Sequence, residues 1–140
     1  IFIDADMNII AERVGEEHAK DCYNWKAMLD LGLRVSGGSD CPVEPFNVLD
    51  NMRSAITRQN RTGTKTYLPE QALTVEQAVR LFTSDAAWPS RDEAVRGTLE
   101  VGRQADLVVL EEDLFDTEPS RFPQVRVLET VLNGVTVYQA

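Results

Sequence analysis

The sequence predicts an α/β fold that changes to antiparallel β structure in its last third. Up to about residue 96, short apolar runs alternate with stretches in which apolar side chains recur every three or four positions, which indicates strands alternating with amphipathic helices. Beyond that point the apolar runs are β-rich, and Asn133-Gly134 between the last two runs is a strong hairpin signal. The change of composition near Arg96 predicts two parts, residues 1–96 and residues 97–140.

The first elements are predicted as strand, helix and strand. Residues 1–3, Ile-Phe-Ile, are a β-type apolar run and predict a short buried strand. Residues 15–31 carry apolar side chains at helical spacing, and Gly32 follows as a glycine that ends a helix. Residues 33–35 then predict a second short strand, which leads into a glycine-rich turn.

Two further helices and a loop are expected in the middle of the chain. Residues 47–59 contain an apolar stripe that predicts an amphipathic helix, and residues 61–66 are polar and predict an exposed loop. Thr74 with Gln77 three positions later is a capping-box signature. The helix that it starts is predicted to continue to Ala86.

The last part is predicted to consist of strands. They are expected at residues 98–99, 105–110, 125–132 and 135–138.

Composition and charge exclude some classes of partner. The 140 residues are 43% hydrophobic and 26% charged, which is ordinary for a soluble globular protein. The formal net charge of −9 argues against nucleic acid and anionic membrane surfaces, because both attract basic patches. No apolar run is long enough for a membrane span and no signal-peptide pattern begins the sequence, so we expect a cytoplasmic protein with reduced Cys22 and Cys41.

The segment that ends at Asp40 is the most informative for function. A buried strand followed by Gly37 and Gly38 would place a carboxylate at the carboxyl end of a strand, which is where active sites sit in α/β barrels. In the alternative interpretation, Asp40 lies in a simple turn and caps the next helix. Spacing alone favours neither interpretation.

Residues 36–45, Ser-Gly-Gly-Ser-Asp-Cys-Pro-Val-Glu-Pro, resemble the segment after the eighth barrel strand in the amidohydrolase superfamily. The likeness is to its amidohydrolase 3, or exoenzyme-regulatory-like, branch of metal-dependent hydrolases. It continues downstream through Ala-Ile-Thr-Arg at residues 55–58 and Leu-Thr-Val-Glu-Gln-Ala at residues 73–78. Residues 97–110 resemble the family's return into its small β domain, so nearly the whole chain is covered.

The resemblance implies a fold and a chemistry. Residues 1–96 would supply strands seven and eight of a (β/α)8 TIM-like barrel with their following helices, and residues 97–140 the C-terminal segment of a small composite β domain. The family hydrolyses amide or other C–N bonds, outside peptides, through a metal-activated water. By similarity, Asp40 would contact the metal and accept the proton of that water. Arg58 stands where this branch often carries arginine, so it would contact a small-molecule amide substrate or an adjoining loop, or else lie on a solvated helix end.

The sequence departs from the family in its histidines. The family holds its metal with several histidines, and this chain has only His18, in the predicted helix before the second strand, which we interpret as a solvated residue. A catalytic zinc requires about three protein ligands, which Asp40 alone does not supply. We therefore expect that the chain is the C-terminal portion of a longer enzyme. The full-length parent would bind a divalent metal, with zinc as the first expectation. This portion alone would bind none.

Two functions are carried forward from the sequence. In the first, the parent is an amidohydrolase, and this portion alone is inactive and self-associates through exposed strand edges. In the second, the chain is a non-catalytic binding or assembly module that keeps the family's terminal fold. Cys41 lacks a histidine that could activate it, so we expect a small buried residue there, and Glu44 is expected to be a surface carboxylate.

Overall fold

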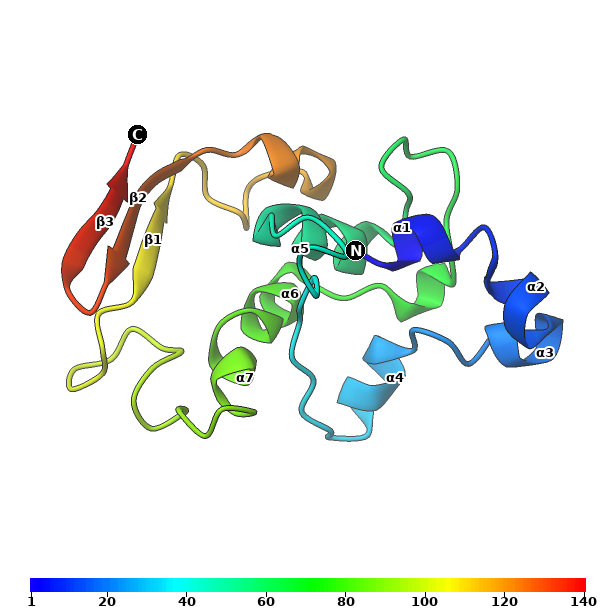
Figure 1. The fold of residues 1–140 in the computed structure, drawn as a ribbon, viewed down its shortest axis with the longest axis horizontal. Coiled ribbons are helices and arrows are strands. Elements are labelled where there is room, and N and C mark those ends of the chain that lie inside the picture. Colours follow the sequence, from blue (N-terminus) through cyan, green and yellow to red (C-terminus); the bar gives the residue numbers. More distant parts are fainter.

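The computed structural model describes residues 1–140, with short helices along the first two thirds of the chain and a three-stranded sheet at its C-terminal end (Figure 1). The α-helices are α1 (Ile3–Asp6), α2 (Ile10–Val14), α3 (Glu16–Ala19), α4 (Trp25–Asp30), α5 (Val48–Thr57), α6 (Val75–Leu81) and α7 (Ser84–Ala87). Two 3-10 helices are η1 (Pro69–Gln71) and η2 (Pro119–Gln124), and the strands are β1 (Leu107–Leu110), β2 (Val127–Leu132) and β3 (Val135–Gln139).

Helix α5 lies at the centre of the molecule (Figure 1). Its Asn47 cap accepts hydrogen bonds from the backbone N–H groups of Leu49 and Asp50, as the expected helix at residues 47–59 requires. Every residue from Leu49 to Ala55 is buried, including four with polar or charged side chains. A helix buried on all sides needs partners around its whole circumference.

Those partners come from both sides of Arg96. The main core cluster joins α5 and α6 to the region before the second strand, and its buried members are Leu49, Met52, Ala78, Leu114, Phe122 and Val125. A smaller cluster of Ala55, Leu73 and Leu81 takes in Trp25, Leu29, Val35 and Phe82. The division of the chain into residues 1–96 and 97–140 stays a prediction, and the core is shared across it.

The sheet has the order β1-β2-β3, and both pairs are antiparallel. Leu107 lies opposite Val131, and Leu132 opposite Val135. The turn between β2 and β3 has positive φ at both Asn133 (48°) and Gly134 (78°), the backbone that a two-residue hairpin requires. The predicted hairpin and the antiparallel arrangement are confirmed.

The two predicted strands of the first half are wrong. Ile1 and Ile3 are buried as expected, but the backbone turns at once into α1, and the N–H of Asp4 donates to the carbonyl of Ile1 at 3.0 Å. Residues 33–35 run without pairing to any strand, and Leu33 is exposed. A strand is completed by hydrogen bonds to a neighbour, and no parallel neighbour lies beside either segment. The chain thus mixes helices with one antiparallel sheet, and the alternation of strands and helices expected before Arg96 is not observed. The strand expected at residues 98–99 is also absent.

The two long predicted helices are each divided in two. The helix expected at residues 15–31 is interrupted at Tyr23, whose φ of 59° is left-handed, so α3 and α4 are separate. The helix that begins at Thr74 has the predicted capping box, but it breaks at Thr83 (φ −128°, ψ −98°) before α7. Gly32 ends α4 with a φ of 78°, and residues 61–66 form an exposed loop, both as predicted.

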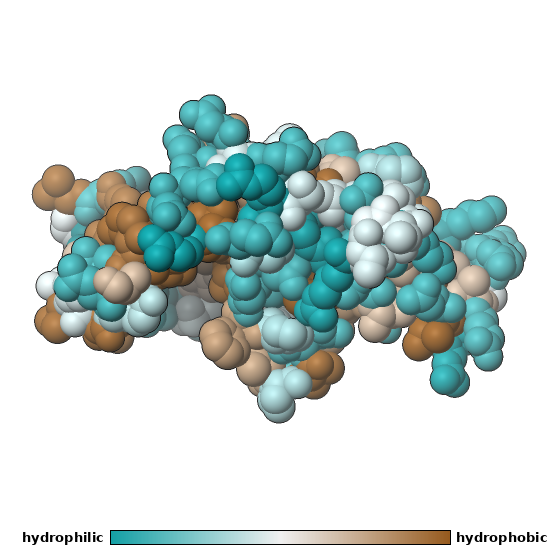
Figure 2. All heavy atoms as spheres, turned by 90° about the horizontal axis from the view of Figure 1, so that it is seen from above, coloured by the Kyte–Doolittle hydropathy of each residue, from teal (hydrophilic) through white to brown (hydrophobic).

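Apolar side chains on the sheet are open to solvent. Figure 2 shows brown side chains gathered at the end of the molecule that carries the sheet. Val108, Leu132, Val135 and Val137 are each more than half exposed. None of the helices has the length and hydropathy that a membrane crossing would need.

Candidate functional site

Asp40 stands on an exposed turn between the extended segment 33–39 and α5. Its φ is 50°, a left-handed backbone that aspartate adopts more readily than most residues, and the turn closes with a hydrogen bond from the N–H of Val43 to the carbonyl of Asp40 at 2.9 Å. A second bond runs from the N–H of Glu44 to the carbonyl of Ser39 at 3.2 Å. The Cys41–Pro42 peptide in this turn is cis. Asp40 itself is exposed, so its carboxylate is open to solvent.

The interpretation of Asp40 as a helix cap is wrong. Helix α5 is capped by Asn47, whose Oδ1 accepts from the N–H of Leu49 at 3.0 Å and of Asp50 at 3.4 Å. Because Asn47 fills the cap position of α5, helix capping does not account for the left-handed backbone at Asp40.

Gly37 fixes the path of the segment that leads to Asp40. Its N–H donates to the carbonyl of Leu81 at 2.9 Å, and a Cβ at this position would lie 2.3 to 2.7 Å from three ring atoms of Phe82. Gly38 has no heavy atom within 4 Å of the corresponding position. Another side chain therefore approaches the backbone closely at Gly37 and not at Gly38.

Glu44 connects the Asp40 turn to the rest of the molecule. Its carboxylate lies 3.9 Å from the guanidinium of Arg61, which also contacts the carboxylates of Asp4 at 3.5 Å and Asp50 at 3.1 Å. The side chain of Glu44 is only 17% exposed, so it is more buried than the surface carboxylate we expected. Arg61 thus brings α1, the Asp40 turn and α5 together around one cation.

Arg58 is buried among aromatic rings. Its Cζ lies 4.8 Å from the ring centroid of Trp25 and 5.9 Å from that of Tyr67, within the range of cation–π attraction. Its Nε donates to the carbonyl of Tyr67 at 3.0 Å and its Nη1 to the carbonyl of Tyr23 at 3.1 Å. The residue itself has a left-handed backbone at the end of α5, with a φ of 57°.

The burial of Arg58 decides between two of its interpretations. The residue has no exposed surface, so a solvated helix end is wrong, and contact with an adjoining loop is observed at Tyr67. Burial lowers the pKa of the guanidinium to about 10. No hydrogen bond or ion pair joins Arg58 to Asp40, and its contact with a substrate stays a prediction.

The side chains described here do not fit a catalytic metal by themselves. No group of three or more His, Cys, Asp or Glu side chains lies where it could hold a metal ion, whereas a catalytic zinc needs about three protein ligands. His18 is exposed on α3, as expected of a solvated helix residue. Cys41 is exposed and free, so the expectation of a buried residue is wrong.

A small hollow lies on the inner side of the segment before Asp40. It has a volume of about 170 Å³, and most of the residues around it are hydrophobic. Gly37, Gly38, Asn51 and Phe82 are among them, and the Oδ1 of Asn51 is buried without a hydrogen-bond partner. The hollow gives the Asp40 segment a mostly apolar inner wall.

Sequence reasoning missed the contacts that hold these elements together. Arg61 lies in the loop predicted at residues 61–66, and no sequence pattern connects it with Asp4, 57 residues away. The Tyr23 and Tyr67 carbonyls are likewise brought to Arg58 by the fold over 35 and 9 residues. Such partners are set by tertiary packing and leave no periodic signal.

Comparison with known proteins identifies relatives over almost the whole chain. Residues 1–138 match the amidohydrolase family. The amidohydrolase YtcJ of Bacillus subtilis (strain 168) is 31% identical over 140 residues, covering 99% of this chain and 26% of that protein. The N-substituted formamide deformylase of Arthrobacter pascens is 32% identical over 124 residues, covering 89% of this chain and 22% of that protein.

One further relative and one solved structure are also similar to this chain. The Arabidopsis thaliana protein LONG AFTER FAR-RED 3 is 28% identical, covering 95% of this chain and 23% of its own length. The crystal structure of an amidohydrolase from Thermotoga maritima MSB8 superposes with a TM-score of 0.61 at 22% identity, over 84% of this chain and 26% of that chain, which shows a shared fold. The chain thus spans about a quarter of the length of the proteins that it matches.

The resemblance first seen in residues 36–45 is confirmed, since the family match includes that segment and nearly all of the residues on either side of it. The chain belongs to the amidohydrolase family.

Proposed function

We propose that this chain is the C-terminal portion of an enzyme that hydrolyses a C–N bond outside peptides, and that Asp40 is its catalytic carboxylate. The observation that carries the proposal is the exposed carboxylate of Asp40, held on a turn whose residues match the family motif. One relative is named for acting on N-substituted formamides, and the bond that a deformylase of such compounds breaks is a C–N bond.

Asp40 has the chemistry for proton transfer. An ionised carboxylate on an open turn can accept a proton from a water molecule that attacks a carbonyl carbon, and a positioned base of this kind contributes about 100-fold to 10,000-fold in rate. Hydrogen bonds from the N–H groups of Val43 and Glu44 to the carbonyls of Asp40 and Ser39 close the turn that carries this carboxylate. A base acts efficiently only when its position is fixed in this way.

In this proposal, the metal implied by the family is bound by the full-length protein and not by this portion alone. Residues 1–140 bring no three candidate ligands together, so the other ligands would lie in sequence outside this portion, which covers 22% to 26% of its curated relatives. In that longer protein, residues 1–96 would form the C-terminal part of a (β/α)8 barrel, in which the segment 33–39, unpaired in this portion, would gain strand neighbours. Residues 97–140, with their antiparallel sheet, would complete a small β domain.

The test is hydrolysis of a panel of N-acyl and N-formyl amines by the full-length protein and by Asp40→Asn. We expect the substitution to lower kcat by at least about 100-fold. Asp30→Asn, an exposed carboxylate on α4 that pairs with Lys26, is the matched control and should retain full activity. Full activity of Asp40→Asn would exclude the role of Asp40.

The same assay separates the enzyme from a non-catalytic module. Metal analysis of the full-length protein would accompany it. A full-length protein that contains no metal and hydrolyses none of the panel would favour the module.

A further inference from the structure

Three arginines surround a polar groove at the start of the segment that leads to Asp40. Two adjoining hollows of about 330 and 280 Å³ are both lined by Arg34, Arg80 and Asp85, and the second also by Arg96. The second hollow has no hydrophobic residue in its lining. Arg34 comes from the extended segment after α4, Arg80 from α6 and Arg96 from the chain after α7, so three separate segments bring their cations to one place.

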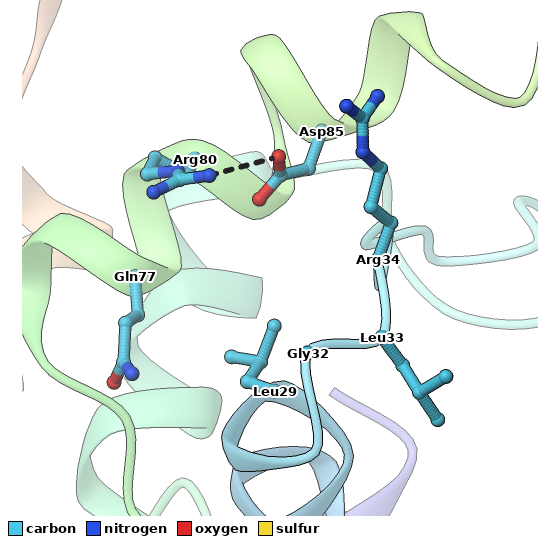
Figure 3. Close-up of a pocket in the computed structure, with 7 residues that line it drawn as sticks. All are labelled: Leu29, Gly32, Leu33, Arg34, Gln77, Arg80 and Asp85. Carbon is cyan, nitrogen blue, oxygen red and sulfur yellow. Dashed lines mark hydrogen bonds and ion pairs between the residues drawn. The ribbon is translucent and has the colours of Figure 1, made fainter.

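Most hydrogen-bond donors of these guanidinium groups are unused. Each guanidinium carries five N–H donors in a planar fork. Arg80 contacts Asp85 through Nη2 at 3.4 Å, and Arg96 contacts Asp92 at 2.9 Å. Arg34 forms no ion pair, and its Cζ lies 5.6 Å from the ring centroid of Trp88. Figure 3 shows Asp85 between Arg80 and Arg34, bonded only to Arg80.

The wall of the groove is built by close packing at Gly97. A Cβ on Gly97 would lie 3.0 Å from the Cα of Ser84 and 3.1 Å from the Cβ of Ala87, so the chain after α7 is pressed against that helix. This contact places Thr98 and Ser84 together in the lining. The hydroxyl oxygen of Thr98 is buried and has no hydrogen-bond partner within the protein.

We propose that this groove binds a phosphoryl group, either as inorganic phosphate or as part of a small phosphate ester. Three guanidinium groups offer more N–H donors than the two oxygens of a carboxylate can accept, whereas a phosphoryl group presents three or four oxygens. Arginine forks match these oxygens in pairs. Three arginines line this one hollow on a chain with a formal net charge of −9.

The neighbouring carboxylates limit the affinity. Asp85 and Glu93 also line the second hollow, and Glu93 forms no ion pair there. The side chains of Arg80 and Arg96 are 58% and 47% exposed, so water and salt weaken their attraction for an anion. We expect a dissociation constant of about 1 mM for inorganic phosphate.

The experiment titrates the protein with inorganic phosphate at constant ionic strength and follows the 31P resonance. Glycerol phosphate is titrated in parallel to separate free phosphate from a phosphate ester, and acetate, which contains no phosphorus, is added as a competitor that displaces bound phosphate. Saturable binding of either phosphate probe, with acetate at least about fivefold weaker, is the expected result. No saturable binding of either phosphate probe, or acetate binding of equal strength, would overturn the proposal.

Variants locate the binding. Arg34→Gln should raise the dissociation constant at least about fivefold, while Glu93→Gln should lower it about twofold to threefold by removing a repelling charge. Because a misfolded protein does not bind more tightly, the gain in Glu93→Gln cannot come from damage to the fold. Arg126→Gln is the matched control, since Arg126 pairs with Glu111 beside the sheet. Equal weakening by Arg126→Gln would show that the attraction is unspecific.

Discussion

The guanidinium of Arg58 lies over the indole ring of Trp25, 4.8 Å from its centroid, and so links the end of α5 to the start of α4. The same side chain donates to the carbonyls of Tyr23 and Tyr67, which no other side chain contacts through a hydrogen bond. A buried cation with these partners stabilises the structure only as long as all of its contacts are present.

Arg58→Met is expected to lower the free energy of unfolding by about 3 kcal/mol, because the carbonyls of Tyr23 and Tyr67 lose their donor and the rings lose a buried cation. Arg58→Lys should also destabilise the protein, since an ammonium group cannot replace a planar fork between two rings. Urea unfolding measures both changes. Arg126→Met, at an exposed ion pair, serves as the control and should change the stability by less than about 1 kcal/mol. An effect of that small size for Arg58→Met would contradict the structural role.

Gly37→Ala should destabilise the protein by about 1 to 3 kcal/mol, because its methyl group would overlap the ring of Phe82. Gly38→Ala is the matched control, with open space around the added methyl group and no expected loss. Gly37→Ala should cost less stability in the Phe82→Leu background than in the unsubstituted protein, because the ring that the methyl group overlaps is gone. Thermal unfolding of the four proteins forms a double-mutant cycle, and strictly additive effects would rule out the overlap.

Tyr23 predicts a dependence of stability on alkaline pH. Burial, together with the hydrogen bond to the carboxylate of Asp6, raises the pKa of the Tyr23 hydroxyl above its usual value of 10.0. The folded state therefore keeps this proton at a pH where the unfolded state has lost it. The contribution is fully present below pH 10 and is lost as the pH rises above it.

The variant Tyr23→Phe tests this contribution. Its stability should fall less steeply above pH 10 than that of the unsubstituted protein, and at pH 8 it should be lower by about 1 kcal/mol for the missing hydrogen bond. Tyr138→Phe, on the exposed strand β3, is the control and should keep the steep fall. Urea unfolding at pH 8 and at pH 10.5 gives both comparisons, and identical slopes for Tyr23→Phe and the unsubstituted protein would speak against the assignment.

Two substitutions of Asp40 are expected to differ in stability and to be alike in activity. Since the backbone at Asp40 is left-handed, Asp40→Gly should be more stable than Asp40→Ala by about 1 kcal/mol. Both variants would lose the proposed catalytic carboxylate, so both should be equally inactive in the full-length enzyme. Differential scanning calorimetry together with the hydrolysis assay distinguishes the two effects. A more stable Asp40→Ala would mean that the turn relaxes when the carboxylate is removed.

Local chemistry in the sequence predicted local structure well. The capping box at Thr74, the glycine that ends α4 and the Asn133-Gly134 hairpin are each determined by a few adjacent residues, and each is observed. The family assignment from residues 36–45 is confirmed for the same reason, because its motif is a run of adjacent residues that form one turn.

Features that depend on distant partners could not be predicted in this way. Residues 1–3 and 33–35 have the composition of strands, yet a strand requires a hydrogen-bonded neighbour, and the chain turns into helix or runs unpaired without one. The aromatic surroundings of Arg58 and the three carboxylates around Arg61 depend on contacts over tens of residues. Periodicity carries no information about such contacts.

The segment from Arg34 to Gly38 has a single backbone hydrogen bond to another element, the one from Gly37 to Leu81 at the end of α6. The location of the Asp40 carboxylate therefore depends in part on α6, a helix that supplies no residue to the proposed hydrolytic site. A substitution that loosens the start of α6, such as loss of the Thr74 cap, would shift the carboxylate without touching it, and activity would respond to a change made more than thirty residues downstream.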